Sequence, residues 1–409
     1  MSLQPGRHAL TFVFITVVVD MIGIGLILPV LPALIRELAH VDVAQAAVIG
    51  GWLLVAYSAM QFLCGPIVGN LSDAYGRRPV LLLALGGLGI DYVLCAFAPS
   101  IAWLFIGRLL AGTFGASHVT AYAYITDITP PEQRAKAFGM VGAAFGIGFV
   151  IGPAIGGLLG AYGPRVPFMA AAVLALANVV YGWFVLPESL PPEKRRPFRF
   201  KRANPLGSLA VLRRDPLLSV FGVVVFLHFL ATNVYPAVWA YYTIYRYGWS
   251  ELQVGLSLAV YGIVTAAVQG GLVGPIIARL GEWRTALLAL CVEVAAGFGY
   301  GIASAGWFIY VLIVVGAPQN IALPAINAMM TRRVGASAQG ELQGALASIT
   351  GITAIIGPLL ATQLFGHFTG PQAPTELPGA PFFAAMLLSA IAAWLFLRTR
   401  VLAASGPPA

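Results

Sequence analysis

Four ionisable side chains, Asp20, Asp91, Arg108 and Glu293, stand inside long apolar stretches of this 409-residue sequence. The chain is 59% hydrophobic and only 9% charged, so these residues are unusual in their surroundings. A charge inside a membrane span is costly and by default marks a proton relay, an ion path or a ligand contact. The acids can take up and release protons, and the arginine can neutralise a carboxylate. The expected chemistry is therefore proton coupling.

Asp91 and Arg108 are expected to pair, because they flank the short turn at Pro99 by eight and nine residues. At about 1.5 Å per helical residue both lie roughly 12–14 Å from that turn, on adjacent helices. One interpretation is structural, since a buried pair can simply fix helix register. The other is that Asp91 takes up a proton and Arg108 is its movable partner. Asp20 and Glu293 have no base near them in sequence and suit proton exchange or substrate contact.

Aromatic and amide side chains in the apolar stretches could line a site for a planar organic ligand with polar edges. The histidines there, His118 and His228, could relay protons or be hydrogen-bonded core residues. The candidate substrate contacts are Tyr57, Gln61, His118, Asn233, Tyr235, Gln319 and Asn320.

Helices must position these residues, because backbone groups in lipid are satisfied within each span and the period-2 alternation of a barrel is missing. Stretches long enough to cross a bilayer recur along the chain. The sequence predicts an all-α membrane protein with twelve transmembrane helices, at 9–31, 46–68, 80–98, 101–123, 137–160, 167–186, 217–241, 254–277, 285–303, 306–330, 341–365 and 380–398.

The basic residues predict the orientation of these spans. All but four of the 23 Lys and Arg residues fall on the side that carries both termini, which is therefore predicted to be cytoplasmic. The exceptions are Arg36, Arg165 and Arg246 on the other side and Arg108 within a span. The net charge of +8 is thus a topology signal. It favours a lipid bilayer over nucleic acid as the partner.

An internal repeat divides the chain. Gly69 and Gly274, Gly76 and Gly281, LLLAL and ALLAL, and two Gly-Pro pairs are all 205 residues apart. Duplicated six-helix halves are a transporter architecture with the substrate site between the halves. The predicted parts are a six-helix bundle at 1–186, a basic linker at 187–216 and a second bundle with a short tail at 217–409.

Two glycine-containing stretches have predicted roles in gating. In GNLSDAYGRRPV, Asp73 can cap or pair across helix ends, and its arginines can bond carboxylates or helix ends near Asp127. This arrangement predicts a latch that holds the inner gate shut. The alternative is that the arginines only fix the orientation of the chain in the membrane. The matching loop at 278–284 lacks the acid, so the latch is expected to matter more in the first half. The glycine ladder, on one face of the fifth span, permits close packing. It is either static or shapes how the halves meet. The residues of the predicted gating loop are Gly69, Asp73, Gly76, Arg77, Arg78 and Asp127. The residues of the glycine ladder are Gly148, Gly152, Pro153, Gly156 and Gly160.

Enzymatic signatures are missing from the sequence. It has no phosphate-binding GxxxxGK[ST] loop, no His/Cys/carboxylate cluster with metal spacing and no strong nucleophile motif. We therefore expect no enzyme activity, no resident metal and no cofactor.

The stretches GNLSDAYGRRPV, GFVIGPAIGGLLG and IGRLLAG resemble motifs of the drug/proton antiporters in the major facilitator superfamily. VVDMIGIGLILPVLP and NIALPA resemble the tetracycline efflux proteins more closely. The resemblance implies a monomeric exporter in a bacterial inner membrane that exchanges a drug, with its bound magnesium, for a proton. It assigns proton coupling to Asp20, Asp91, Arg108 and Glu293, and gating to the loop with Asp73.

Several cavity positions depart from that family pattern. Glu293 replaces an aspartate, Thr265 a histidine and Asn233 a glutamine, and His118 stands where a small residue is usual. These changes leave the antiport framework in place but leave open whether the drug is tetracycline or another compound. A symporter that imports a metabolite and a non-transporting receptor or scaffold are the alternatives.

Overall fold

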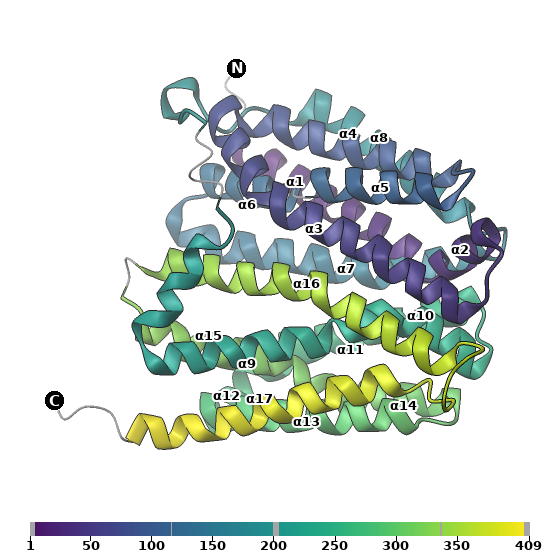
Figure 1. Ribbon diagram of the computed structural model, residues 1–409. Helices are drawn as coiled ribbons and strands as arrows, with labels where there is room; N and C mark the ends of the chain where they lie inside the picture. The colour runs from purple at the N-terminus through teal and green to yellow at the C-terminus, as the bar shows by residue number, and fades with distance from the viewer. Residues whose placement is uncertain (1–4, 116, 199–203, 336–337, 405–409) are drawn as a thin grey trace. The chain divides into compact units, whose positions relative to one another are not determined.

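Every regular element of the described chain is helical (Figure 1). The computed structural model describes the backbone of residues 5–115, 117–198, 204–335 and 338–404, and the side chains of these residues except 5–10, 117–118, 131, 135 and 401–404. The main helices are α1 (Pro5–Ile27), α2 (Leu31–Ala39), α3 (Val43–Tyr75), α4 (Arg77–Ala96), α5 (Ile101–Phe114), α6 (Ser117–Ile128), α7 (Arg134–Gly160), α8 (Val166–Val185), α9 (Pro216–Thr232), α10 (Val234–Tyr247), α11 (Glu251–Ala267), α12 (Val273–Leu280), α13 (Glu282–Ile302), α14 (Gly306–Gly316), α15 (Ala322–Arg333), α16 (Gln339–Thr369) and α17 (Ala380–Ala404).

Ten of the described helical segments are long and apolar enough to cross a membrane, or eleven if α1 and α2, bent by 48°, form one span. The predicted span at 101–123 is divided between α5 and α6, of 14 and 12 residues, and each piece alone is short for a crossing. The helix count is consistent with the predicted twelve spans. The all-α membrane fold is confirmed.

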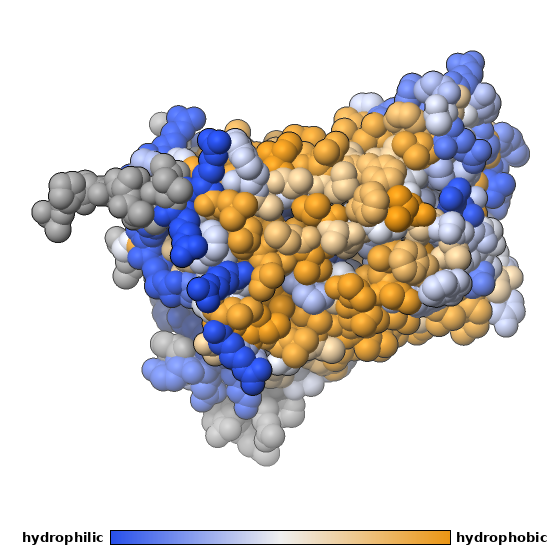
Figure 2. All heavy atoms as spheres, turned by 90° about the horizontal axis from the view of Figure 1, so that it is seen from below, coloured by the Kyte–Doolittle hydropathy of each residue, from blue (hydrophilic) through white to orange (hydrophobic). Residues whose placement is uncertain are grey.

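Hydrophobic side chains cover the outside of these helices. On the face shown in Figure 2 they form a broad apolar region, with hydrophilic residues gathered at the helix ends. Leu387, Ile391 and Trp394 of α17 are about half exposed, as are Leu288 and Phe298 of α13. Such a continuous apolar surface suits lipid rather than water.

The chain forms two compact units. Unit 1 comprises residues 1–41, 56–204 and 249–262, and unit 2 comprises 42–55, 205–248 and 263–409. In unit 1, α1 packs against α7 and α8, and α4 packs against α5 and α8. In unit 2, α13 packs against α14, α15 and α17, and α9 packs against α16 and α17. The predicted domain boundaries at residues 187 and 216 stay a prediction.

The predicted repeat has a structural counterpart at two turns. Gly76 precedes α4 with φ 108° and ψ 157°, and Gly281 precedes α13 with φ 74° and ψ 162°. Positive φ angles favour glycine because a side chain would clash with the backbone. The two turns therefore share one backbone conformation at the 205-residue offset. The linker between the halves contains short 3-10 helices at Pro192–Lys194 and Gly207–Arg214, and residues 199–203 lie outside the described part.

Candidate functional site

The expected pair of Asp91 and Arg108 is present in unit 1. Arg108 Nη2 lies 2.6 Å from Asp91 Oδ2, and the side chains are 16% and 0% exposed. Cys95, one turn after Asp91, donates from Sγ to Asp91 Oδ1 at 3.3 Å. Gly107 leaves room for this group, since a Cβ atom there would lie 2.6 Å from Asp91 Oδ1. The carboxylate is therefore enclosed, neutralised by one cation and hydrogen-bonded on both oxygens.

Further polar residues of unit 1 surround this pair. Gln61 Nε2 donates to the Tyr57 hydroxyl at 3.0 Å and to the carbonyl oxygen of Gly115 at 3.2 Å. Tyr57 and Tyr92 both interact electrostatically with Asp20 as well as with the pair. The Tyr92 hydroxyl also lies against Gly23, one turn after Asp20. The first helix therefore brings its acid into the same polar region as Asp91 and Arg108.

Glu293 lies in a second polar cluster, in unit 2. Its Oε2 is 2.7 Å from Nδ1 of His228 on α9, and its Oε1 accepts a hydrogen bond of 2.8 Å from Ser389 Oγ on α17. The side chains of His228 and Glu293 are 6% and 1% exposed. No sequence pattern links these three residues, which lie on α9, α13 and α17. Ser389 in particular carries no signal beyond being a polar residue in an apolar stretch.

The other candidate substrate contacts of unit 2 have partners of their own. Asn233, at the break between α9 and α10, donates from Nδ2 to the Phe229 carbonyl oxygen at 2.8 Å. Tyr235 packs edge-on against Tyr300, with ring centroids 5.4 Å apart. Asn320 Nδ2 donates to Thr265 Oγ1 at 3.3 Å. Thr265 is the position at which the tetracycline efflux family is expected to carry a histidine.

Gln319 differs from Asn233 and Asn320. It is 5% exposed, and its side-chain carbonyl oxygen has no hydrogen-bond partner within the described chain. The side chain of His118 lies outside the described residues. Because Tyr57 and Gln61 belong to unit 1 and the remaining candidates to unit 2, their joint role as one lining stays a prediction.

Arg77 is the centre of the charged turn. It lies 2.5 Å from Asp73 Oδ1 and 3.0 Å from Asp127 Oδ2, and it donates to Ser72 Oγ at 2.7 Å. Arg78 donates from Nη2 to the carbonyl oxygen of Trp183, near the end of α8, at 2.6 Å. The turn thus ties together the ends of α3, α4, α6 and α8.

Glu188, which follows α8, is a residue of this turn that the sequence analysis missed. Its Oε1 accepts backbone hydrogen bonds from Arg77, Ser189 and Leu190 at 2.8 to 3.0 Å, and its Oε2 accepts one from Arg78 at 3.3 Å. It caps α4, where a carboxylate satisfies unpaired N–H groups and matches the helix dipole. The sequence signal was an acid directly after a predicted span, at the start of the basic linker.

The matching turn of unit 2 carries a pair of opposite polarity. Arg332 Nη1 donates to Glu282 Oε1 at 2.6 Å. At the 205-residue offset Glu282 corresponds to Arg77, and Arg332 corresponds to Asp127. The repeat therefore keeps an ion pair between the same two positions and exchanges its charges.

The glycine ladder packs against α1, which belongs to the same half of the sequence. Cβ atoms at Gly148, Gly152 and Gly156 would lie 2.3 to 2.8 Å from atoms of Met21, Gly25 and Leu26 respectively. Gly160, the last glycine of the ladder, lies against both Val30 and Glu251 of α11, so the role of this face in how the halves meet stays a prediction. A neighbouring face, with Gly157, contacts the first turn of α11.

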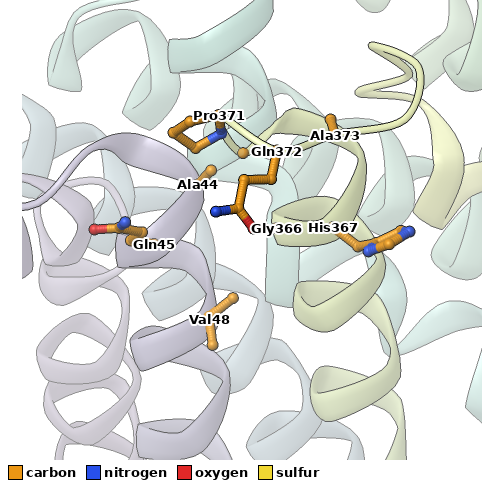
Figure 3. A pocket seen from close by; sticks show the side chains of 9 residues that line it. Ala44, Gln45, Val48, Gly366, His367, Pro371, Gln372 and Ala373 are labelled. Atoms are coloured by element: carbon orange, nitrogen blue, oxygen red, sulfur yellow. The ribbon is translucent and has the colours of Figure 1, made fainter.

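A pocket of about 380 Å³ lies in unit 2, between the start of α3 and the end of α16 (Figure 3). The Gln372 side chain extends between these two helices, and His367 lies on α16. None of the predicted site residues lines it; the lining is Ala44, Gln45, Val48, Gly366, His367, Gly370, Pro371, Gln372 and Ala373. Within the described residues no group of three or more His, Cys, Asp or Glu side chains could hold a metal ion.

Comparison with known proteins identifies the family of this chain. The sequence matches the Major Facilitator Superfamily over residues 13–358, and again over 221–409. The class C tetracycline resistance protein of Escherichia coli is 41% identical over 362 residues, which is 88% of this chain and 91% of that protein. The class G protein of Vibrio anguillarum is 37% identical over 369 residues, which is 89% and 92% of the two chains.

A solved structure shares the fold. The human organic anion transporter TETRAN superposes with a TM-score of 0.71 at 25% identity, over 96% of this chain and 99% of that one. These relatives are transport and resistance proteins rather than enzymes. The chain therefore belongs to the Major Facilitator Superfamily, as a multi-pass membrane transporter similar to the tetracycline resistance proteins.

Proposed function

We propose that this protein is a proton-coupled antiporter that exports a drug-like organic compound by alternating access. It would act as a monomer in a bacterial inner membrane, with both termini in the cytoplasm. The similarity to tetracycline resistance proteins over most of both chains supports export of a drug. The bias of Lys and Arg toward one side supports the orientation.

The observation that carries the proton coupling is the buried pair of Asp91 and Arg108. As an ion pair it is neutral overall, so it is tolerated in a low-dielectric interior. A proton arriving at Asp91 makes the carboxyl neutral and leaves Arg108 without its counter-ion at 16% exposure. Arg108 must then find another anion or water, which requires rearrangement. Proton binding and conformational change are thereby linked through one contact.

The energy available is sufficient for drug export. A singly charged drug–magnesium cation exchanged for one proton moves no net charge and is driven by the pH gradient alone. For a drug without net charge, one charge crosses the membrane for each proton, and a potential of about 100 mV supplies about 2.3 kcal/mol. Since about 1.4 kcal/mol corresponds to a tenfold concentration ratio, this supports a gradient of roughly 50-fold before any pH gradient is added.

The substrate is proposed to be of the tetracycline type or a broader range of planar drugs. The proposed substrate contacts are Tyr57, Gln61, His118, Asn233, Tyr235, Gln319 and Asn320. Gln319 fits a ligand contact because its buried carbonyl oxygen lacks a partner within the described chain. A magnesium ion would then arrive as part of a chelated substrate, as cargo.

The test is transport of tetracycline with Mg²⁺ by the purified protein in proteoliposomes under an imposed pH gradient. We expect uptake when the lumen is acidic, with release of lumenal protons, for protein inserted with its cytoplasmic side outward. Movement of both species in the same direction would indicate a symporter. Binding without transport for every compound tried, in a panel of antibiotic classes, would favour a receptor. Either result overturns the proposal.

A further inference from the structure

We propose that His228, Glu293 and Ser389 form a second proton-binding site, which holds one exchangeable proton while it is buried. The site lies entirely in unit 2 and shares no residue with Asp91 and Arg108. Its use in transport rests on the proposed function, but its ability to bind a proton does not.

The geometry is that of a shared proton. Nδ1 of His228 and Oε2 of Glu293 are 2.7 Å apart, a short distance for a nitrogen–oxygen hydrogen bond. One hydrogen must lie between these atoms, because two acceptors without a proton would repel each other. Ser389 Oγ donates to the other carboxylate oxygen at 2.8 Å, and so satisfies the atom that His228 does not reach.

Charge balance shows why this proton is exchangeable. Arg108 carries a permanent positive charge, so the pair in unit 1 is neutral without any added proton. An imidazole is neutral unless protonated, so His228 with an ionised Glu293 leaves a net negative charge at 1% exposure. Burying such an isolated charge costs several kcal/mol. One additional proton, on either residue, makes the buried pair neutral.

Water reaching the site would reverse this preference. A hydrated carboxylate is stable without its proton, and an imidazole in water loses its proton near pH 6.5. The proton therefore binds when the cluster is enclosed and leaves when the cluster is hydrated on a side near neutral pH. No covalent bond changes; the proton passes from water to the pair and back to water.

No other charged group of the described chain interacts with the His228 imidazole. The charged and titratable side chains on the elements packed around α9 and α13 lie mostly toward helix ends. They are Arg213, Arg214 and Asp215 before α9, Tyr235, Tyr241, Tyr242, Tyr245, Arg246 and Tyr247 on α10, Arg279 on α12, Glu282, Arg284, Cys291 and Tyr300 on α13, Tyr310 on α14, Arg332 and Arg333 on α15, Glu341 and His367 on α16, and Arg398 and Arg400 on α17.

Infrared titration of the purified protein tests the site without any substrate. Between about pH 5 and 9 we expect the wild type to show a carboxyl signal that titrates, and Glu293→Gln to lose it. His228→Asn keeps a hydrogen-bond donor at the position of Nδ1 but cannot hold the proton. The pH midpoint of the carboxyl signal should therefore move by about one pH unit or more. His367→Gln, in the same unit but outside the cluster, should leave it in place. A wild-type signal retained in Glu293→Gln, or unmoved in His228→Asn, overturns the proposal.

Transport stoichiometry gives the second readout. The ratio of protons to tetracycline, from the voltage that stops net flux in proteoliposomes, should fall by one in Glu293→Gln. In His228→Asn the ratio should stay and the pH of half-maximal rate should move. Unchanged values in both variants mean that the cluster only holds helices together. If the wild type does not transport tetracycline at all, the proposed function fails, while the infrared titration still decides the proton site. Should Glu293→Gln fold poorly, His228→Asn supplies both readouts.

Discussion

Each unit buries one acid among apolar helices, but the two acids have different partners. Asp91 faces Arg108, a permanent cation, at 2.6 Å, and Glu293 faces His228, a titratable base, at 2.7 Å. The first pair is neutral without a proton, and the second is neutral only with one. Two halves of a repeat can therefore solve the same electrostatic problem with different proton occupancy. In an enclosed state the proton is expected on unit 2 rather than on Asp91.

The inner turns of the two units show a similar contrast. They share the backbone conformation at Gly76 and Gly281, and each carries one ion pair between equivalent positions, with the charges exchanged. The surroundings differ: the glycine of unit 1 lies against the Glu188 carboxylate, whereas no atom of the described residues lies within 4 Å of a Cβ atom at Gly281. The turn of unit 1 is thus braced by the start of the linker, and that of unit 2 is open.

The largest expected effect is that of Asp91→Asn. Loss of the titrating group should reduce proton-driven tetracycline transport by about two orders of magnitude or more, the scale for removing a proton-transfer group. Thermal stability should also fall, because Arg108 keeps its charge at 16% exposure without a counter-ion, so the amount of protein in the membrane is measured beside transport. Uptake rates in proteoliposomes with an imposed pH gradient measure this. Rates equal to wild type would show that the pair in unit 1 is purely structural.

Neutralising one partner of each turn pair should affect the units unequally. Arg77 is 10% exposed in its side chain, and removing a partner from such a buried pair costs about 3–5 kcal/mol. Arg332 is 66% exposed, and an exposed pair contributes about 1 kcal/mol at most. Arg77→Gln should therefore lower the midpoint temperature of thermal unfolding far more than Arg332→Gln does. Equal shifts would contradict the difference between the turns.

Alanine at the two turn glycines separates backbone strain from crowding. Both substitutions force a side chain into positive φ, which costs about 1–2 kcal/mol. At Gly76 a Cβ atom would additionally lie 2.3 Å from Glu188 Oε2 and displace the cap of α4. We expect Gly76→Ala to be the more destabilising, and the double variant with Glu188→Ala to remove only the crowding part. The midpoint of thermal unfolding measures both, and a larger loss at Gly281 would argue against bracing by Glu188.

The smallest effect is expected from the acids at the rims of the turns. Asp73→Asn removes a carboxylate that is 41% exposed but contacts Arg77 at 2.5 Å. It should lower transport more than Glu282→Gln, because only Asp73 belongs to the network that ties four helices together. Each effect on stability should stay near 1 kcal/mol or below, as for other exposed pairs. Identical transport rates in the two variants would rule out a latch confined to unit 1.

Much of this fold was predictable because hydrophobicity along a chain is a local property. Long apolar stretches specify membrane helices wherever they occur, and the Lys and Arg bias indicates their direction. The pair of Asp91 and Arg108 was also predictable, since a short turn places residues at equal distances from it at the same depth. The turn at Gly76 was recognisable from its glycine and its clustered charges.

Only the tertiary structure decided which helix faces meet. His228 and Glu293 are 65 residues apart, and Ser389 is 96 residues beyond Glu293, so no local pattern joins them. Glu188 lies 111 residues from Arg77. The sequence does not specify which helix packs against the glycine ladder, and the structure shows that it is α1. Periodicity reports that a residue lies on a helix, but the partner of a buried polar group depends on the rotation and packing of helices distant in sequence.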